Sequence, residues 1–298
     1  KAADAACRPA ADGRAQVPPL RRTTNGAHIE ALLHMIIDCH IHLASPEGRY
    51  DPEEVAACRR LAERAGIGRA VYLFNLKDRG GYDPAPEDVR RSNDLGMRLV
   101  SEHPDFFLGF CYLSPAHDPA FSLAEIERCI VEGPLTGIKL WVSVHADDPL
   151  LDPIMERAAS LGVPVLHHAW YKATGYAFNE STPAQIAVLA RRHPTVPIIM
   201  AHLAGSGWRG VQDVKATPNV VVDTSGAQPI AGLVEYAVRE LGPERVIYGS
   251  DWPIRDFSTQ VARVKGASLT EDERALILRG NAERILLGQM VGKGAAGV

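Results

Sequence analysis

The strongest constraint on the fold is a regular alternation of short apolar runs with amphipathic stretches, which begins at Met35. The apolar runs are rich in Val, Ile and Leu and are nearly continuous, which is typical of strands buried on both faces by crossover helices. The eight runs cover residues 35–41, 69–74, 106–113, 136–142, 163–170, 196–203, 219–225 and 245–253. Eight strands, each followed by a helical stretch, within about 260 residues predict a (β/α)8 TIM barrel.

The stretches between the apolar runs carry helix signals. Residues 51–66 place Pro52 near the start, keep apolar residues at helical spacing and end at Gly66, as a helix does. Further helices are expected over residues 86–104, 119–132, 149–162, 182–194, 229–241 and 270–287.

An open, doubly wound sheet is the competing α/β architecture. No GxGxxG turn follows the first apolar run, and no phosphate loop of the form GxxxxGKS or GxxxxGKT occurs. Nucleotide-binding sheets use these glycine patterns to hold a phosphate at a helix N-terminus. The closed barrel is therefore favoured.

Residues 1–34 differ from the rest of the chain, because they are rich in Ala, Arg and Pro and have no clear period. We expect them to form an N-terminal extension or leader outside the core. Residues 35–298 are expected to form a single barrel domain with an extra C-terminal helix. Arg21 and Arg22 are similar to a twin-arginine export signal, but no clean apolar segment follows them, as such a signal requires.

Composition narrows the classes of partner. The formal net charge of −4 provides no basic field for nucleic acid or an anionic membrane. No uninterrupted apolar stretch approaches the roughly 18 residues of a membrane span. The five cysteines are odd in number and none are spaced as CxxC, which favours a reducing cytoplasm. We expect a small-molecule substrate and allow a homo-oligomer, although no stretch specifies an interface.

Titratable side chains gather at the carboxyl ends of six of the eight apolar runs. They are His40, His42, Lys139, His167, His168, His202, Asp223 and Asp251. In a barrel these ends meet at one face, which is where catalytic residues lie. Residues i and i+2 of a strand share a face, so His40 and His42 are expected to converge. Imidazole nitrogens with a carboxylate suit zinc and similar ions, and Asp251 comes beside the first strand when the barrel closes.

These motifs, in this order, resemble the amidohydrolase superfamily. The resemblance rests on His40-Ile41-His42, "PVLHHA" (164–169), "AHLAG" (201–205), "GSDWP" (249–253) and "GNAERILL" (280–287). It covers residues 35 to 288 and is strongest for the amidohydrolase-2 branch. That branch also holds decarboxylases similar to aminocarboxymuconate-semialdehyde decarboxylase.

The resemblance implies a set of metal ligands. His40 and His42 would bind the metal from the first strand, and His168, rather than His167, from the fifth. His202 would be a ligand of a second metal or a general acid and base. Asp251 would bind the metal and accept a proton from a nucleophilic water. Zinc or another divalent ion, as one or two ions, is the expected cofactor.

Lys139 leaves two interpretations open. In two-metal amidohydrolases a strand-four lysine is carbamylated and bridges the ions, and "GIKLW" (137–141) places Lys139 on that strand. The resemblance therefore makes Lys139 a candidate metal ligand and favours hydrolysis. The alternative is an unmodified lysine that binds a substrate carboxylate or pairs with an acid.

Aromatic and basic residues just beyond the strands are candidates for binding substrate. Trp141, Trp170 and Trp252 are placed to form walls for a flat or apolar molecule. Arg255 is a candidate for gripping a carboxylate. Asp223 is expected to orient a neighbouring ligand or to cap the next helix.

The resulting expectation is a metal-dependent hydrolase that attacks the carbonyl of an amide, ester or lactone with an activated water. Asp251, with His202, would take the proton of that water, and the metal or His202 would stabilise the oxyanion. The alternative enzyme is a metal-dependent, non-oxidative decarboxylase of a small carboxylic acid. A metal-free lactonase and a non-catalytic barrel that only binds a small molecule are further alternatives.

Overall fold

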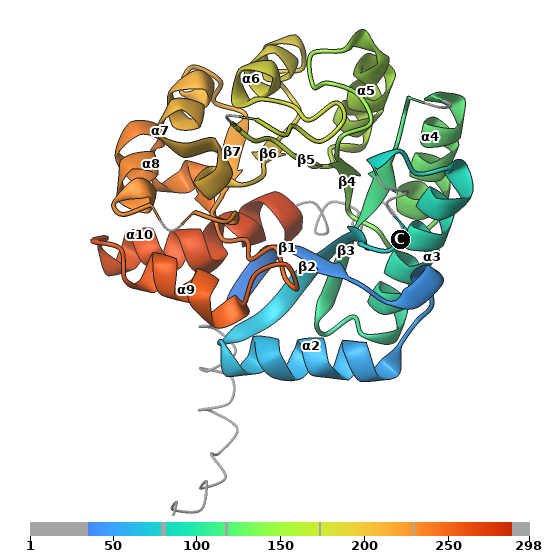
Figure 1. The fold of residues 1–298 in the computed structure, drawn as a ribbon, viewed down its shortest axis with the longest axis horizontal. Coiled ribbons are helices and arrows are strands. Elements are labelled where there is room, and N and C mark those ends of the chain that lie inside the picture. The colour runs from blue at the N-terminus through green and yellow to red at the C-terminus, as the bar shows by residue number, and fades with distance from the viewer. Residues whose placement is uncertain (1–34, 79–81, 117–118, 173, 229, 288–298) are drawn as a thin grey trace, which may run out of the picture. The chain divides into compact units, whose positions relative to one another are not determined.

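The computed structural model describes residues 35–78, 82–116, 119–172, 174–228 and 230–287. Its eight parallel strands pair in chain order to form one sheet, which curls into a barrel (Figure 1). The strands are β1 (Ile36–Leu43), β2 (Ile67–Asn75), β3 (Phe107–Leu113), β4 (Gly137–Leu140), β5 (Val165–His167), β6 (Ile198–Met200), β7 (Val220–Asp223) and β8 (Val246–Ile247). The predicted (β/α)8 TIM barrel is confirmed.

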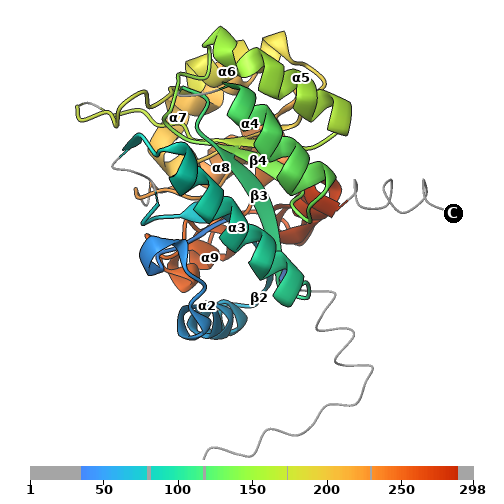
Figure 2. The same ribbon diagram turned by 90° about the vertical axis from the view of Figure 1, so that its right-hand side faces the viewer.

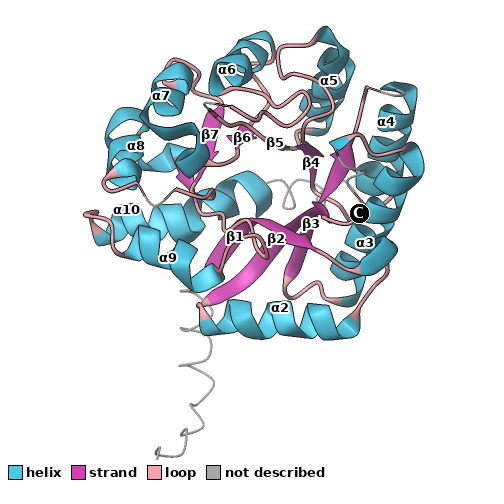
Figure 3. Cartoon of the chain, in the orientation of Figure 1, coloured by secondary structure: helices cyan, strands magenta, loops and turns pink. Residues whose placement is uncertain are grey.

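Helices surround the strands on the outside of the barrel (Figure 3). They are α2 (Pro52–Arg64), α3 (Pro86–Glu102), α4 (Pro119–Ile126), α5 (Asp152–Leu161), α6 (Pro183–Arg192), α7 (Leu203–Val214), α8 (Leu233–Leu241), α9 (Phe257–Lys265) and α10 (Glu271–Ala275), with π-helical turns η3 (Glu127–Val131), η6 (Leu276–Gly280) and η7 (Glu283–Leu287). Figure 2 shows α3 and α4 lying over β3 and β4. The helix predicted from Pro52 begins there, because the Asp51 side chain caps the backbone N–H groups of Glu53 and Glu54.

The end of the eighth unit closes the barrel on the first strand. The backbone N–H of Cys39 donates to the carbonyl of Tyr248 at 3.0 Å, and that of His42 donates to the carbonyl of Trp252 at 2.7 Å. The N–H of Asp251 donates to the carbonyl of His40, also at 2.7 Å. Closure therefore sets Asp251 directly beside the two histidines of β1.

An irregularity in β1 determines which way the histidines point. The pairing with β2 shifts between Asp38 and Ile41, which is the signature of a β-bulge. Cys39 belongs to the same buried cluster as Leu166 and Ile199 of facing strands, and His40 lines the cavity at the barrel mouth. The bulge therefore turns two consecutive residues, Cys39 and His40, towards the inside.

Several strands are shorter than the apolar runs that predicted them. The sixth run was expected to extend to Leu203, but β6 ends at Met200 and α7 begins at Leu203. His202 between them has a φ of 68°, and Asp251 after β8 has a φ of 66°. Left-handed backbone does not continue a strand, so both residues stand at sharp turns rather than on strands.

Two expectations concern regions away from the barrel strands. Residues 1–34, expected to be an extension, fall outside the described residues, so that expectation stays a prediction. None of the helices described has the length and apolarity that crossing a membrane requires.

Candidate metal centre

The two histidines of β1 meet edge to edge at the barrel mouth. Their Nε2 atoms are 3.3 Å apart. The Nδ1 of His42 lies 3.0 Å from the carbonyl oxygen of Phe74, which can only accept, so His42 carries its proton on Nδ1. The Nδ1 of His40 lies 2.7 Å from the Asp223 carboxylate and donates to it. Both Nε2 atoms therefore present lone pairs to each other.

The carboxylate of Asp251 joins this pair. Its Oδ1 lies 3.5 Å from the Nε2 of His40 and 3.5 Å from the Nε2 of His42. The ligand atoms of the three side chains all lie within 4.8 Å of one another, and all three residues are buried. Two imidazole lone pairs and one carboxylate oxygen that converge in this way fit a divalent cation. These residues are the ones that would hold the metal.

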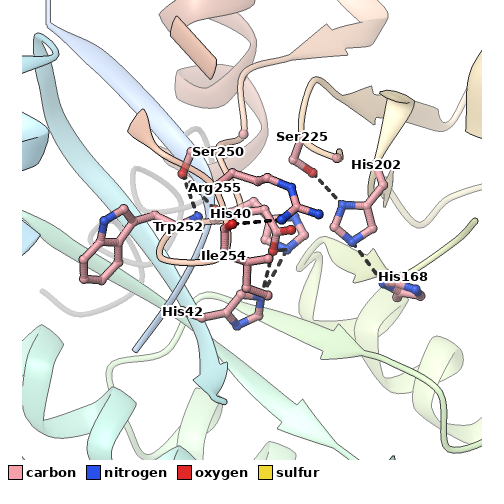
Figure 4. Close-up of polar contacts among 12 residues, drawn as sticks. His40, His42, His168, His202, Ser225, Ser250, Trp252, Ile254 and Arg255 are labelled. Carbon is pink, nitrogen blue, oxygen red and sulfur yellow. Dashed lines mark hydrogen bonds and ion pairs between the residues drawn. The ribbon is translucent and has the colours of Figure 1, made fainter. Parts of the chain in front are cut away.

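A second pair of imidazoles lies next to the first. The Nε2 of His202 is 3.0 Å from the Nδ1 of His168, and Figure 4 shows His202 between His168 and Ser225. The Nδ1 of His202 lies 2.8 Å from the Oγ of Ser225, whose hydroxyl donates to Asp223. His202 therefore donates from Nδ1 and turns the lone pair of its Nε2 towards His168.

Asp223 is the common support of both pairs. Its Oδ2 accepts from His40, and its Oδ1 accepts from the backbone N–H groups of His202 and Ser225 at 2.9 and 3.0 Å. The expectation that Asp223 orients a neighbouring ligand agrees with these contacts. Since all of these side chains are buried, the carboxylate fixes the orientation of the rings without competition from water.

Burial sets the protonation of the cluster. Desolvation, followed by the charges of Lys139 and His168, holds the pKa of His40 well below its usual range. Desolvation, followed by the neighbouring His40, does the same to the pKa of His42. Burial also raises the pKa of Asp251 to about 8, and the charge of Asp223 adds to this. The imidazoles are thus neutral ligands, and the protein without a bound cation disfavours a bare carboxylate at Asp251.

The cluster opens into a cavity of about 320 Å³ that His40, His42, Lys139, His168, His202 and Asp251 all line. Trp141, Trp170 and Arg255 line it as well, and their expected role in binding substrate stays a prediction. Phe74 and Tyr82 add two more aromatic rings. Polar side chains therefore form the floor of the cavity and aromatic rings form its walls. Such a cavity suits a small, flat molecule.

Trp252 lies elsewhere. It is not among the residues that line the cavity. Its ring stacks on Phe257 at a centroid distance of 5.4 Å and points away from the histidines (Figure 4). The tryptophan of "GSDWP" thus packs behind the turn that carries Asp251.

Lys139 is held on β4 between its neighbouring strands, with 1% of its surface exposed. Burial lowers its pKa to about 8, although the charges of Asp223 and Asp251 oppose this effect. Its Nζ lies 5.8 Å from the centre of the Phe74 ring. Among the described residues it has no hydrogen bond or ion pair to a carboxylate.

One residue of the site escaped the sequence analysis. Glu180, in the segment between β5 and α6, lines the cavity and accepts a hydrogen bond from the Nε2 of His168 at 2.7 Å. It also pairs with Lys172 at 2.8 Å. No strand directly precedes Glu180 and no recognised motif contains it, so the sequence did not indicate that Glu180 belongs to the site.

Known proteins resemble this chain along most of its length. A gamma-resorcylate decarboxylase from Polaromonas sp. is 27% identical over 280 residues, which cover 76% of this chain and 85% of that protein. An L-fucono-1,5-lactonase from Burkholderia ambifaria is 27% identical over 83% of this chain and 93% of that protein. A solved structure of a dihydroxybenzoic acid decarboxylase from Polaromonas sp., with bound manganese and the inhibitor 2-nitroresorcinol, has a TM-score of 0.70. It is 21% identical and covers 85% of this chain and 97% of that chain, which supports the fold.

These relatives correct the expected reaction. The sequence analysis favoured a hydrolase that attacks a carbonyl with water, and this is wrong, because curated relatives are named gamma-resorcylate decarboxylases. The decarboxylase, which the sequence analysis kept as its alternative, is better supported. The reason is chemical: the same imidazole and carboxylate donors serve both reactions, so the donor set does not distinguish them.

The family itself is established by the sequence. The residues that carried the resemblance, from the histidines of β1 to the closing helix, all fall within one match to a family profile. That profile, described as Amidohydrolase, covers residues 37–287, and the chain therefore belongs to the amidohydrolase family.

Proposed function

We propose that this chain is a metal-dependent, non-oxidative decarboxylase of a small aromatic carboxylic acid. The observation that carries the proposal is the meeting of two imidazole lone pairs and the Asp251 carboxylate at the floor of an aromatic cavity. The gamma-resorcylate decarboxylases among the relatives support the reaction class. His40, His42, His168 and Asp251 would hold the ion, and His202 lies beside them.

The bound cation would supply Lewis-acid charge that anchors and polarises the oxygens of the substrate. Manganese is the ion in the related Polaromonas structure, and a site of nitrogen and oxygen donors also accepts zinc. Elemental analysis of protein purified without chelator distinguishes manganese from zinc.

The aromatic walls would position the ring of the substrate. Phe74 and Trp141 lie 5.4 Å apart between ring centres, and Tyr82 lies 5.3 Å from Trp141. Flat rings that line one side of a cavity favour a flat substrate and exclude water from it.

Decarboxylation needs one proton. The bond between the ring carbon and the carboxylate breaks, its electron pair stays on the ring carbon, and that carbon then takes a proton. We assign delivery of the proton to Asp251, because the Oδ2 of this carboxyl has no hydrogen-bond partner among the described residues while its Oδ1 faces His40 and His42. His202 carries its proton on Nδ1, where it donates to Ser225, so its Nε2 holds no proton to deliver.

The test is turnover of 2,6-dihydroxybenzoate, the compound bound in a related decarboxylase structure, and of other hydroxybenzoates by protein loaded with manganese or zinc. Release of carbon dioxide with the matching phenol is the expected result, and Asp251→Asn is the control that should slow it about 100-fold or more. Hydrolysis of a sugar lactone with no release of carbon dioxide from any hydroxybenzoate would overturn the proposal.

A further inference from the structure

His168 is held differently from the other three histidines of the site. The described contacts give His40, His42 and His202 a proton on Nδ1, because their Nδ1 atoms face Asp223, the carbonyl of Phe74 and Ser225. His168 has the opposite arrangement, since its Nε2 faces the carboxylate of Glu180 at 2.7 Å. A carboxylate accepts and does not donate, so His168 carries its proton on Nε2.

Burial and two further contacts fix the position of the Glu180 carboxylate. It is 3% exposed, and its Oε2 accepts from the backbone N–H of Ala177 at 3.1 Å and pairs with Lys172 at 2.8 Å. The carboxylate is therefore a fixed acceptor for His168.

The backbone on both sides of Glu180 is also anchored. The N–H of Trp170 donates to the carbonyl of Ser181 at 2.9 Å, and the Oγ of Ser181 accepts from the N–H of Ala146 at 2.9 Å. The side chain of Asn179 donates to the carbonyl of Ser143 at 2.8 Å. Hydrogen bonds to neighbouring loops thus hold the backbone around Glu180 close to the end of β5.

We propose that Glu180 is a positioning residue that fixes the ring of His168 with the lone pair of Nδ1 turned into the cavity. The inference rests on the metal site of the proposed function. A free imidazole prefers neither ring nitrogen strongly enough to define one ligand atom, and a hydrogen bond to the other nitrogen selects it. Lys172 has a lesser role, because it contacts Glu180 and not His168.

The experiment compares three variants of the full chain, Glu180→Ala, Glu180→Gln and Lys172→Met, with zinc as the probe. Glu180→Ala removes the acceptor, Glu180→Gln keeps a neutral acceptor, and Lys172→Met leaves the carboxylate in place. We expect the dissociation constant of zinc, measured by competition with a chelator, to rise about 10- to 100-fold in Glu180→Ala. Glu180→Gln should recover most of this loss, and Lys172→Met should stay within about threefold of the natural protein.

A spectroscopic measurement separates positioning from loss of structure. His103 and His193 also carry their protons on Nε2, because His103 Nδ1 accepts from Arg59 and His193 Nε2 faces Asp152. Nitrogen NMR of the metal-free protein should therefore show several such rings, and the signal of His168 is the one that disappears in His168→Asn. That signature should be lost in Glu180→Ala and kept in Lys172→Met. A Glu180→Ala protein that binds zinc as tightly as the natural one, or a His168 ring protonated on Nδ1, would overturn the proposal. Equal losses in Lys172→Met and Glu180→Ala would do the same.

Neither readout depends on turnover. A protein that releases no carbon dioxide from any hydroxybenzoate but shows the expected zinc affinities and ring signature refutes the decarboxylase and supports the role of Glu180. A protein that decarboxylates normally but binds zinc equally with and without Glu180 refutes the positioning role alone.

Discussion

The carboxylate of Asp223 lies 2.7 Å from the Nδ1 of His40 and turns the opposite nitrogen of that ring towards His42 and Asp251. One acidic residue on β7 thereby sets the ligand atom that β1 presents. Because Asp223 also holds the backbone of His202, it links the two imidazole pairs of the centre.

Replacing Asp223 tests this link. Asp223→Asn places an amide where His40, His202 and Ser225 all donate, so at least one donor loses its acceptor. We expect the affinity for manganese or zinc to fall about 10- to 100-fold. Competition with a chelator measures this. Ser225→Ala is the matched control, since it removes the hydroxyl between Asp223 and His202 but leaves the contact with His40, and its metal affinity should fall much less.

Asp251 is expected to act in the chemical step as well as in metal binding. Asp251→Asn keeps the size of the side chain and removes the proton that the carboxyl would deliver. We expect kcat for decarboxylation to fall about 100- to 10,000-fold, the usual range for loss of a general acid. Rapid quench of metal-loaded variant and natural protein gives the rates. Retention of kcat within tenfold would assign the proton to another group.

Metal content distinguishes the two interpretations of Lys139. Protein purified without chelator and with bicarbonate present is analysed for metals and by intact mass. About one divalent ion per chain and an unmodified mass would make Lys139 a substrate contact. About two ions and the mass of an added carboxyl group would make it a bridging ligand. Lys139→Met should lower metal content only in the second case.

Removal of the metal should also lower stability. A ligand that binds only the folded protein stabilises it by about 2.7 kcal/mol at a hundred times its dissociation constant. Chelation should therefore lower the Tm, and added manganese or zinc should restore it. His40→Ala together with His42→Ala is the control, because that protein should show no shift with metal. An equal shift in the control would place the stabilising ion at another site.

The stability of the folded protein at acid pH should depend on Glu125, which does not line the cavity of the metal centre. Burial raises its pKa, but hydrogen bonds from Arg128 and Asn93 outweigh burial and lower the pKa below its usual 4.5. A lowered pKa stabilises the folded state above the pKa of the unfolded chain, and this stability is lost as pH falls through the folded value. Glu125→Gln should reduce the free energy of unfolding by about 1–3 kcal/mol at neutral pH.

Urea unfolding of both proteins from neutral pH to well below pH 4.5 checks this expectation. The difference between natural protein and Glu125→Gln should shrink as Glu125 takes up its proton. Comparing the two proteins at each pH cancels the effect of histidines in the metal centre. A difference that stays constant down to the acid limit would show that Glu125 contributes through shape rather than charge.

The barrel could be predicted from the sequence because strands that are buried on both faces consist of nearly unbroken runs of apolar residues. The sequence also predicted which side chains meet, since His40, His168, His202 and Asp251 all lie at the carboxyl ends of such runs. It did not predict where the runs stop being strands. At His202 and Asp251 the backbone turns left-handed, and that change follows from closure and loop packing rather than from local preference.

Two further points lay beyond the sequence for physical reasons. Glu180 reaches His168 because the intervening segment folds back on itself, and the spacing of the residues does not encode that return. Trp252 followed the pattern of a wall residue, but the turn at Asp251 sends its ring to Phe257. The reaction could not be read from the candidate ligands either, because the same donors would serve a hydrolase and a decarboxylase.

Closure of the barrel through Asp251 and His40 has a consequence for synthesis on the ribosome. The chain emerges with the β1 histidines first, His168 later and Asp251 near the end, so a nascent chain holds the three proposed imidazole ligands long before it holds the carboxylate. Under the proposed function, imidazoles without the carboxylate would leave the ligand set incomplete. Firm capture of an ion would then wait until the last strand has left the ribosome, and a chain cut short before Asp251 would lack one proposed ligand.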